Sequence, residues 1–553
     1  MGIYVVGAVG ILVFYCAVLA VGIWAGTKQK NRGDEEVLLA GRSIGLAVGV
    51  LTLIATWVGG GYINGTAEAM FNTGLAWCQV PIGYSLSLLF GVMLFVKPMR
   101  EENYFTMLDP FQRKYGNRIG ALLYLPALLG DIVWVGAILN ALGSSLVVIL
   151  ELDPITSVVV SAVFAAVYTM VGGLYSVTYT DVLQLACIII GLLLSTPYIY
   201  LNPAVDPQLV SSSDWLGHIE QQDIGEWLDV LFLITFGGIP WQGYFQRILS
   251  LRSLKIAQIL SIVGMFGCVA MAIAPAFIGV VAKGTDWSSV PDFHRNVTKR
   301  DAEIILPLAL RFLTPAWVSF FGLGAITAAV MSSADSSILA SSSMFYRNIY
   351  KLAFRPNASE REMTWVMRIS VLTITALSTL IALTVTSVYY LSYVSSDLVY
   401  VILFPQLLLV VHFSKYVNSY GCIASYVVGM VLRLLGGEEG LGLPPLIRYP
   451  MYNEETGDQK FPFRTFAMLG SLVSHLLVSG VTNHLFMNRV IDPARWDILG
   501  IFNEQSSDNE LPAISTVSRN VDDQPIIRKD ELVSDSNGGV ANPAVETYRS
   551  LPA

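Results

Sequence analysis

The chain has 553 residues, of which 54% are hydrophobic and 13% are charged. A soluble domain carries about 25% charged residues, so this composition excludes an ordinary soluble protein and predicts an all-α protein that crosses the membrane many times. Residues 501–553 hold nine acidic and four basic side chains, which is more than half of the formal net charge of −8. The net charge therefore describes the end of the chain and not the membrane domain.

The five cysteines are scattered along the chain, mostly within apolar segments and without a paired short spacing. This pattern predicts buried packing residues, and it argues against a disulfide framework or a thiolate metal site. We recognise no hydrolytic triad and no phosphate-binding loop, so the sequence predicts neither an enzyme nor a nucleic-acid partner.

Apolar segments long enough to cross a hydrocarbon layer about 30 Å thick predict roughly thirteen membrane helices. Their approximate ranges are 3–25, 45–71, 76–96, 122–149, 155–172, 180–201, 228–249, 256–282, 304–345, 364–387, 391–412, 418–436 and 464–487. The first range is too long for the apolar part of a cleavable signal peptide, and no basic residue precedes it. We expect it to be a membrane span.

The distribution of lysine and arginine predicts the orientation of these helices. Three basic residues follow the first predicted helix and almost no charge precedes it, which places the amino terminus outside. Basic residues also gather after the third, seventh and ninth predicted helices, whereas the connections 72–75, 150–154 and 388–390 have none. The same topology places the glycosylation sequon at Asn296 outside.

Two of the predicted helices carry glycine-rich interruptions. Residues 45–71 contain the run Gly59-Gly60-Gly61, and each glycine in a helix interior costs about 0.8–1.0 kcal/mol relative to alanine. Residues 228–249 contain the run Gly237-Gly238-Ile239-Pro240. Unwound backbone at membrane depth must be surrounded by protein or by a water-filled cavity. The sequence therefore predicts a midplane binding site between two interrupted helices of a transporter built from two repeats.

Trp57 and Tyr62 flank the first interruption, and Trp241 and Tyr244 lie at the second. Tyr84 lies in the next predicted helix and Trp134 in the fourth. Ring faces attract a quaternary ammonium, and this contact is worth about 2 kcal/mol or more when it is desolvated. Packing, or anchoring at the membrane interface, is the alternative role of such rings. The position beside unwound backbone favours binding for Trp57 and Trp241, whereas both roles stay open for Tyr84 and Trp134.

Small and hydroxyl residues surround one acid in the stretch 328–337 of the ninth predicted helix. Serine hydroxyls and unwound carbonyls suit Na⁺, although small residues also let membrane helices pack closely. Asp335 favours the functional interpretation because an acid inside the membrane is costly. The other acids within apolar segments, to which the sequence assigns no role, are Glu68, Asp131, Asp181, Asp229 and Asp397. Some of these acids could lie at interfaces or pair with Arg247.

The chain resembles the sodium/solute symporter family. Residues 172–184, GGLYSVTYTDVLQ, fit a signature of that family, together with the serine-rich segment 329–337. A closer likeness to its choline-transporting members lies in TWVGGGYINGTAEA (56–69), PIGYSLSL (81–88), GGIPWQ (237–242), MSSADSSIL (331–339) and SSDLVY (395–400). Such runs cover most of the membrane domain, and the acidic tail contributes nothing to the resemblance.

This resemblance implies a leucine-transporter-type fold with two inverted repeats, about 45–201 and 228–412, one additional helix before them and two after them. It implies sodium-coupled, chloride-dependent uptake of choline at the plasma membrane of nerve terminals, feeding acetylcholine synthesis, with synaptic vesicle membranes as a second location. The substrate would be enclosed by Trp57, Tyr84, Trp134 and Trp241. Sodium would be bound by the carbonyls of Ala55, Val58 and Ala329 and the hydroxyls of Ser332 and Ser333, with Asp335 at a cation site nearby.

One position departs from the resemblance: Ser392 stands in the run YLSYVSSDLVY where a tryptophan is expected. We expect residues 1–490 to form the transporter domain and residues 491–553 to form a disordered, acidic, cytoplasmic tail that could bind trafficking proteins. The transporter could also form a homo-oligomer. Two alternatives stay open: a sodium symporter for a sugar, proline or a monocarboxylate, and a channel or sensor that binds a solute without transporting it.

Overall fold

The structure, a computed structural model, describes residues 4–27, 34–171, 174–212, 215–293, 295–454 and 459–502. Within these ranges the chain is built from helices, with four isolated β-bridges and no extended strand. The predicted tail lies outside the described residues from residue 503 onward, as do Gly172 and Gly173 of the family signature. Internal contacts divide the chain into residues 1–499 and 500–553, and everything that follows concerns the first unit.

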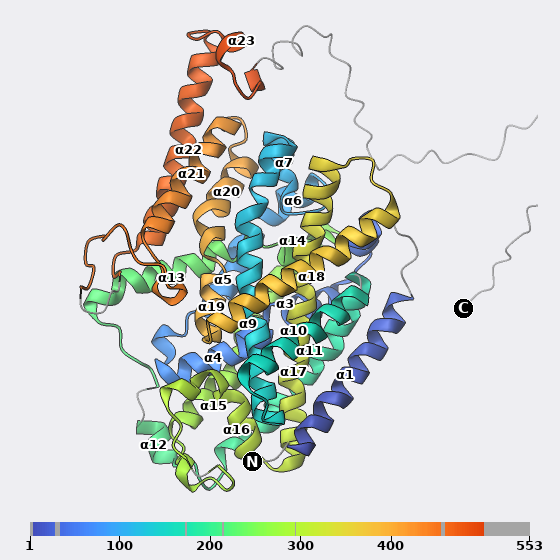
Figure 1. Ribbon diagram of the computed structural model, residues 1–553, viewed down its shortest axis with the longest axis vertical. Helices are drawn as coiled ribbons and strands as arrows, with labels where there is room; N and C mark the ends of the chain where they lie inside the picture. Colours follow the sequence, from blue (N-terminus) through green and yellow to red (C-terminus); the bar gives the residue numbers. More distant parts are fainter. Residues whose placement is uncertain are drawn as a thin grey trace, which may run out of the picture. The chain divides into compact units, whose positions relative to one another are not determined.

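The helices follow one another along the first unit (Figure 1). Helix α1 (Val5–Gly26) is followed by α2 (Asp34–Leu39), α3 (Leu46–Trp57), α4 (Gly60–Asn72), α5 (Val80–Gly91), α6 (Lys97–Glu101), α7 (Asp109–Tyr115), α8 (Asn117–Leu122), α9 (Tyr124–Leu150), α10 (Pro154–Val171), α11 (Leu174–Tyr200) and α12 (Pro207–Ser212). The second half holds α13 (Ile224–Gly237), α14 (Gln242–Leu249), α15 (Leu254–Lys283), α16 (Ile305–Phe312), α17 (Ala316–Met344), α18 (Glu360–Thr384), α19 (Val388–Val394), α20 (Phe404–His412), α21 (Ser419–Leu435), α22 (Phe463–Met487) and α23 (Pro493–Trp496).

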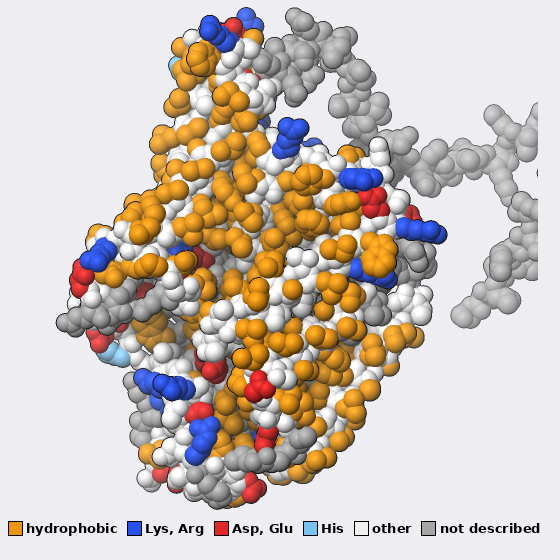
Figure 2. Space-filling model, in the orientation of Figure 1, with side chains coloured by type: hydrophobic (Ala, Val, Ile, Leu, Met, Phe, Trp, Pro, Cys, Tyr) orange, Lys and Arg blue, Asp and Glu red, His pale blue; other side chains and the backbone are white. Residues whose placement is uncertain are grey.

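The described residues contain ten helices that are long and apolar enough to cross a membrane, and α3 and α4 form an eleventh span bent by 50°. Two shorter apolar helices, Pro154–Val167 and Ser419–Leu435, complete the thirteen predicted segments. Figure 2 shows hydrophobic side chains over most of the visible face, as expected of helices that face lipid. The multi-pass, all-α prediction is thus confirmed.

The first interruption lies between α3 and α4, where Val58 leaves the helical conformation and Gly59 is extended, with φ −96° and ψ −173°. These dihedral angles are open to any residue, so the glycines are needed for another reason. A Cβ on Gly59 would lie 1.4 Å from Ser333 Oγ, and one on Gly60 would lie 2.0 Å from a methyl carbon of Val330. Glycine at the break therefore lets its backbone contact α17 directly.

The second interruption separates α13 from α14 at residues 238–241. Pro240 has no amide hydrogen to donate and ends the helical hydrogen-bond pattern, and Trp241 is extended before α14 begins. A Cβ on Gly237 would lie 2.5 Å from the Ser396 carbonyl oxygen. Close packing against the segment that follows α19 therefore excludes a side chain at this break too.

One predicted segment is wrong in its continuity. The range 304–345 is not a single helix, because Leu313, Thr314 and Pro315 separate α16 from α17. Pro315 has φ −60° and ψ 153° and stands just before the first turn of α17, a place that suits its fixed φ. Beyond Met344 the same span continues as a π-helix, Phe345–Phe354.

The two interrupted helices open two runs of five spans each, the first ending with α11 and the second with α20. Because five is odd, the second run crosses the membrane in the opposite sense to the first, which is the arrangement of an inverted repeat. Helix α17, the third span of the second run, contacts α3, α4, α9 and α11 of the first run and also α1 (Figure 1). It contacts the helices on both sides of the first break, α3 and α4, and the helix that follows the second break, α14.

Candidate substrate and cation site

Four aromatic residues predicted to bind substrate form one chain of ring contacts. The centroids of Trp57 and Tyr84 are 5.3 Å apart, those of Tyr84 and Trp134 5.9 Å, and those of Trp134 and Trp241 6.3 Å. The last two pairs are edge-to-face. All four side chains are buried, with Trp241 the most exposed at 8%. We call these four residues the aromatic cluster.

Hydrogen bonds fix three of the four rings. Trp134 Nε1 donates to Ser337 Oγ at 3.1 Å, and Trp241 Nε1 donates to the Gly237 carbonyl at 2.8 Å within the second break. The Tyr84 hydroxyl donates to the Ser392 carbonyl at 2.8 Å. Trp57 Nε1 is buried without a hydrogen-bond partner. Backbone carbonyls and a serine of α17 therefore fix the orientation of three rings. The indole N–H of Trp57 makes no hydrogen bond.

Ser392, the position where a tryptophan was expected, lies beside this cluster. A Cβ on Gly61 would lie 3.6 Å from Ser392 Oγ and 3.8 Å from the Trp134 ring. The Ser392 hydroxyl donates to the Val388 carbonyl of its own helix. At this point α19 thus contributes backbone and a small side chain to the wall of the cluster.

The other two aromatic residues near the breaks point elsewhere. The Tyr62 hydroxyl donates to the Cys268 carbonyl of α15 at 2.7 Å, and the Tyr244 hydroxyl lies 2.9 Å from Ser261 Oγ of the same helix. Both side chains are almost fully buried. They attach the interrupted helices to α15 and do not join the cluster.

A set of oxygen atoms converges where the end of α3 meets α17. Ser332 Oγ lies 3.4 Å from the Ala55 carbonyl oxygen, and Ser333 Oγ lies 3.5 Å from the Thr56 carbonyl oxygen. The Ala329 carbonyl oxygen faces the first break, 3.5 Å from where a Cβ on Gly59 would stand. Carbonyl and hydroxyl oxygens are the donors expected of a Na⁺ site at a broken helix.

Val58 and Asp335, the two remaining predicted cation ligands, are both buried near this place. Val58 follows the last residue of α3, and its amide donates to the Ile54 carbonyl. Asp335 Oδ1 accepts from the Ser336 amide, while its Oδ2 has no hydrogen-bond partner. The structure thus brings the predicted cation ligands to one region, although the contacts described do not join Asp335 to the oxygens around Ala55.

Asp181 of α11 was one of the acids in apolar segments for which the sequence suggested Arg247 as a possible partner, but the sequence assigned it no role. Ser332 Oγ lies 2.5 Å from its Oδ1, and the Thr52 hydroxyl donates to its Oδ2. The guanidinium of Arg247 lies 3.5 Å from the same Oδ2 and donates to Ser336 Oγ at 2.7 Å. Asp181 therefore links α3, α11, α14 and α17 at the candidate cation site. The sequence carried the signal of an acid within an apolar segment, but the partners of Asp181 come from other helices.

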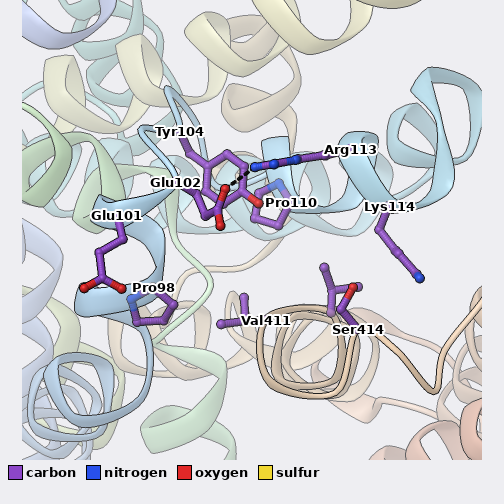
Figure 3. Close-up of a pocket in the computed structure, with 10 residues that line it drawn as sticks. Pro98, Glu101, Glu102, Tyr104, Pro110, Arg113, Lys114, Val411 and Ser414 are labelled. Atoms are coloured by element: carbon purple, nitrogen blue, oxygen red, sulfur yellow. Dashed lines mark hydrogen bonds and ion pairs between the residues drawn. The ribbon is translucent and has the colours of Figure 1, made fainter. Parts of the chain in front are cut away.

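Away from the aromatic cluster, a cavity of about 410 Å³ is lined by α6, α7 and the end of α20. Figure 3 shows that Glu101, Glu102, Arg113 and Lys114 line this cavity, with Glu102 and Arg113 joined by an ion pair. None of the predicted binding residues lies among the residues described around it. Asn296, the predicted glycosylation residue, is exposed between Trp287 and α16.

Two interrupted membrane helices, an aromatic cluster at the breaks and an oxygen-rich contact beside it define a membrane transporter of the inverted-repeat class. Residues 37–429 match the family model described as "Sodium:solute symporter family". The protein belongs to the sodium:solute symporter family. This membership confirms the predicted family and the prediction that the chain is a transporter and not an enzyme.

Relatives with about half of their residues identical extend over most of the chain. The "High-affinity choline transporter 1" of Drosophila melanogaster is 49% identical over 565 residues, covering all of this chain and 91% of that protein. The "High affinity choline transporter 1" of Homo sapiens is 50% identical over 513 residues, covering 89% of this chain and 88% of that protein.

A solved structure of a Na⁺-coupled sialic acid symporter in a substrate-bound, outward-open state is similar in fold, with a TM-score of 0.69 and 16% identity. The match covers 86% of this chain and 97% of the other. This likeness confirms the predicted leucine-transporter-type fold, and at this identity it is a statement about the fold alone.

Proposed function

We propose that the protein is a sodium-coupled choline transporter. The observation that carries this proposal is the aromatic cluster, whose rings touch one another at both interrupted helices. Choline carries a fixed positive charge and cannot donate a hydrogen bond from its quaternary nitrogen, so it is bound best by ring faces. The names of the relatives that share about half of their residues with this chain support the same substrate.

The cluster suits a cation because its rings are not already occupied by one. Among the described residues, the arginine–ring contacts fall on other aromatic side chains, such as Phe105 and Phe463. A sugar, proline or a carboxylate would require hydrogen-bonding or cationic groups facing the substrate, and the rings between Trp57 and Trp241 supply few of these. The composition of the aromatic cluster therefore favours choline over the solutes of other symporters.

Coupling to sodium follows from the position of the oxygen atoms. A sodium ion bound between the Ala55 carbonyl and the hydroxyls of Ser332 and Ser333 would hold the end of α3 against α17. If this contact stabilises the state that admits choline, each ligand raises the affinity for the other by the same factor. The membrane potential adds about 2.3 kcal/mol per charge per 100 mV, and this term favours inward movement of both cations.

In this proposal the two interrupted helices move against the rest of the membrane domain and expose the site to each side in turn. The amino terminus is outside, and the tail after α22 is cytoplasmic. Uptake requires chloride, takes place at the plasma membrane of nerve terminals and supplies choline for acetylcholine synthesis. These finer points come from the family resemblance and belong to the proposal.

The test is uptake of labelled choline into proteoliposomes that contain the purified protein. An inward sodium gradient is expected to drive accumulation, replacement of sodium by potassium to abolish it, and replacement of chloride by gluconate to reduce it. Excess unlabelled proline or glucose is expected to have no effect. Binding of choline without accumulation would indicate a sensor and contradict the proposal, as would accumulation that does not depend on sodium.

A further inference from the structure

A seam of polar and aromatic contacts leads away from the aromatic cluster between α9 and α17. Trp134 of α9 donates to Ser337 of α17, as described above, and the Tyr124 hydroxyl donates to the Ser341 carbonyl at 3.3 Å. Between them, the Asp131 carboxyl faces the side chain of Ser341. The spacings of three and seven residues along α9, and of four along α17, place each set on one helix face.

The seam runs from the cluster toward the end of the membrane domain that the basic loops assign to the cytoplasm. A helix rises about 1.5 Å per residue, so Asp131 lies about 5 Å beyond Trp134 along α9, and Tyr124 about 15 Å beyond it. The Tyr124 ring is 6.1 Å from that of Phe345, where the π-helical end of the α17 span begins. Asp131 thus stands one turn inward from the cluster.

Asp131 is buried without a cationic partner among the described residues. Its side chain is 3% exposed, and its Oδ2 has no hydrogen-bond partner. The ion pairs found in the described part of the chain do not include it, and the group that faces it is the neutral side chain of Ser341. An ionised acid inside the membrane is costly, and without a partner it is by default a functional residue.

Two buried acids of the membrane domain are paired with an arginine, whereas Asp131 is not. The Asp181 carboxylate has the Arg247 guanidinium within 3.5 Å, and Asp397 forms an ion pair with Arg433. Asp131 has no such cation, although it lies next to a cluster suited to a cationic substrate. A carboxylate oxygen left free at this position is complementary to a quaternary ammonium, which is attracted by charge and makes no hydrogen bond.

We propose that Asp131 is a second, inner binding station for choline, which receives the ammonium group as it leaves the aromatic cluster toward the cytoplasm. This inference rests on the proposed function. The α9–α17 seam forms one wall of the inward route, with Trp134 at its start and Tyr124 at its end. In the structure described here all three side chains are buried, so the route opens when the site faces the cytoplasm.

The experiment compares choline transport from the two faces of the membrane. Right-side-out and inside-out vesicles from the same cells give the half-saturating choline concentration for entry at the outer face and at the inner face. Asp131→Asn is expected to raise the inner value at least tenfold and to leave the outer value within about twofold. Asp131→Glu, which keeps the charge on a side chain one methylene longer, is expected to raise the inner value about threefold.

Ser145→Ala is the matched control, because Ser145 is buried on the same helix, lies outward of the cluster and bonds to its own helix at the Ala141 carbonyl. It should change neither value. An equal change at both faces in the Asp131 variants, or no change, would overturn the proposal. A shift confined to sodium dependence would make Asp131 a sodium ligand and also overturn it. Failure of the unaltered protein to transport choline would instead reject the proposed function.

Discussion

At the scale of single residues, Trp241 offers the most direct test of the aromatic cluster. It lies in the second break, its Nε1 bonds to Gly237, and its ring contacts Trp134. Loss of a desolvated cation–π contact worth about 2 kcal/mol corresponds to about a 30-fold rise in half-saturating choline. Trp241→Ala is therefore expected to abolish saturable uptake in the working range, while surface labelling shows that the protein still reaches the membrane.

Two variants separate binding from folding at this position. Trp241→Phe keeps a ring face and should retain saturable uptake at reduced affinity. Trp287→Phe alters a tryptophan that is buried outside the membrane helices and bonds to the Ala282 carbonyl, and it should leave the choline affinity unchanged. Normal choline affinity in Trp241→Ala would mean that the cluster is a packing feature.

The two serines of α17 test the cation site. Ser332 and Ser333 supply hydroxyls beside the carbonyls of Ala55 and Thr56. Replacing both serines by alanine removes two oxygen ligands, so we expect the half-saturating sodium concentration for choline uptake to rise about tenfold or more, because one lost ligand to a charged group costs about 1.5–3 kcal/mol. The measurement is choline uptake as a function of sodium at constant ionic strength.

Ser195→Ala is the control for that measurement. Ser195 is fully buried in α11 and bonds within its own helix to the Gly191 carbonyl, so its loss should leave the sodium dependence unaltered. If the double alanine variant has the sodium dependence of the parent protein, the convergence of oxygens around Ser332 is not where sodium binds.

At the scale of elements, the contact between the first break and α17 depends on glycine. A Cβ on Gly59 would lie 1.4 Å from Ser333 Oγ and 2.3 Å from Ser333 Cβ, distances at which the two segments cannot keep their positions. Gly59→Ala should therefore push the end of α3 away from α17. We expect it to reduce sodium-driven uptake at least tenfold with the protein still present at the surface.

Gly480→Ala is the matched substitution, because Gly480 lies inside α22 and a Cβ there would have no heavy atom within 4 Å. Alanine is favoured over glycine in a helix by about 0.5–1 kcal/mol. This variant is expected to transport normally and to be slightly more stable. Normal uptake by Gly59→Ala would show that the two segments do not need to touch.

The same elements explain what the sequence could and could not predict. Both interruptions were predictable because glycine and proline act on their own segment, through the cost of glycine in a helix and the missing amide of Pro240. The gap at Pro315 was missed because apolar residues continue on both sides of it, and length alone made the two parts look like one helix.

The sequence pattern could not predict the role of a residue whose contacts come from elements far away in the sequence. Asp181 could be recognised as an acid in an apolar segment, but its contacts come from α3, α14 and α17, and no local spacing encodes that meeting. The four rings of the cluster lie on four separate elements. Their shared location was implied by the family resemblance. Asp131 lies one turn from Trp134 on the same helix, so its nearness follows from the spacing, but only the structure shows that none of the described ion pairs includes it.

At the scale of the whole membrane domain, the last two spans, α21 and α22, are attached to the repeats by buried ion pairs. Glu438, in the connection between these spans, pairs with Arg433 of α21 and with Arg464 of α22. Arg433 also pairs with Asp397, which follows α19, and the Tyr390 hydroxyl of α19 donates to Glu438 at 2.7 Å. One carboxylate thus connects three helices.

The electrostatics of Glu438 determine how this attachment depends on pH. Burial by itself would raise the pKa of Glu438, but Arg464 and Arg433 together with the Tyr390 hydroxyl outweigh burial and lower the pKa to about 2. The folded-state pKa is therefore below the unfolded value of about 4.3. The stability from this group is fully present above the unfolded pKa and is lost as the pH falls from there toward 2.

Glu438→Gln should accordingly destabilise the domain. Removing one partner of a buried ion pair costs about 3–5 kcal/mol, because it leaves buried charge uncompensated. We expect a lower midpoint of thermal unfolding for the detergent-purified protein at pH 7, and a smaller further loss between pH 5 and pH 3 than in the parent protein. Glu454→Gln is the control, since Glu454 pairs with Arg448 in an exposed loop, where both side chains are more than half exposed and such pairs contribute about 0–1 kcal/mol. Equal losses in the two variants would mean that the buried pairs do not hold α21 and α22 to the repeats.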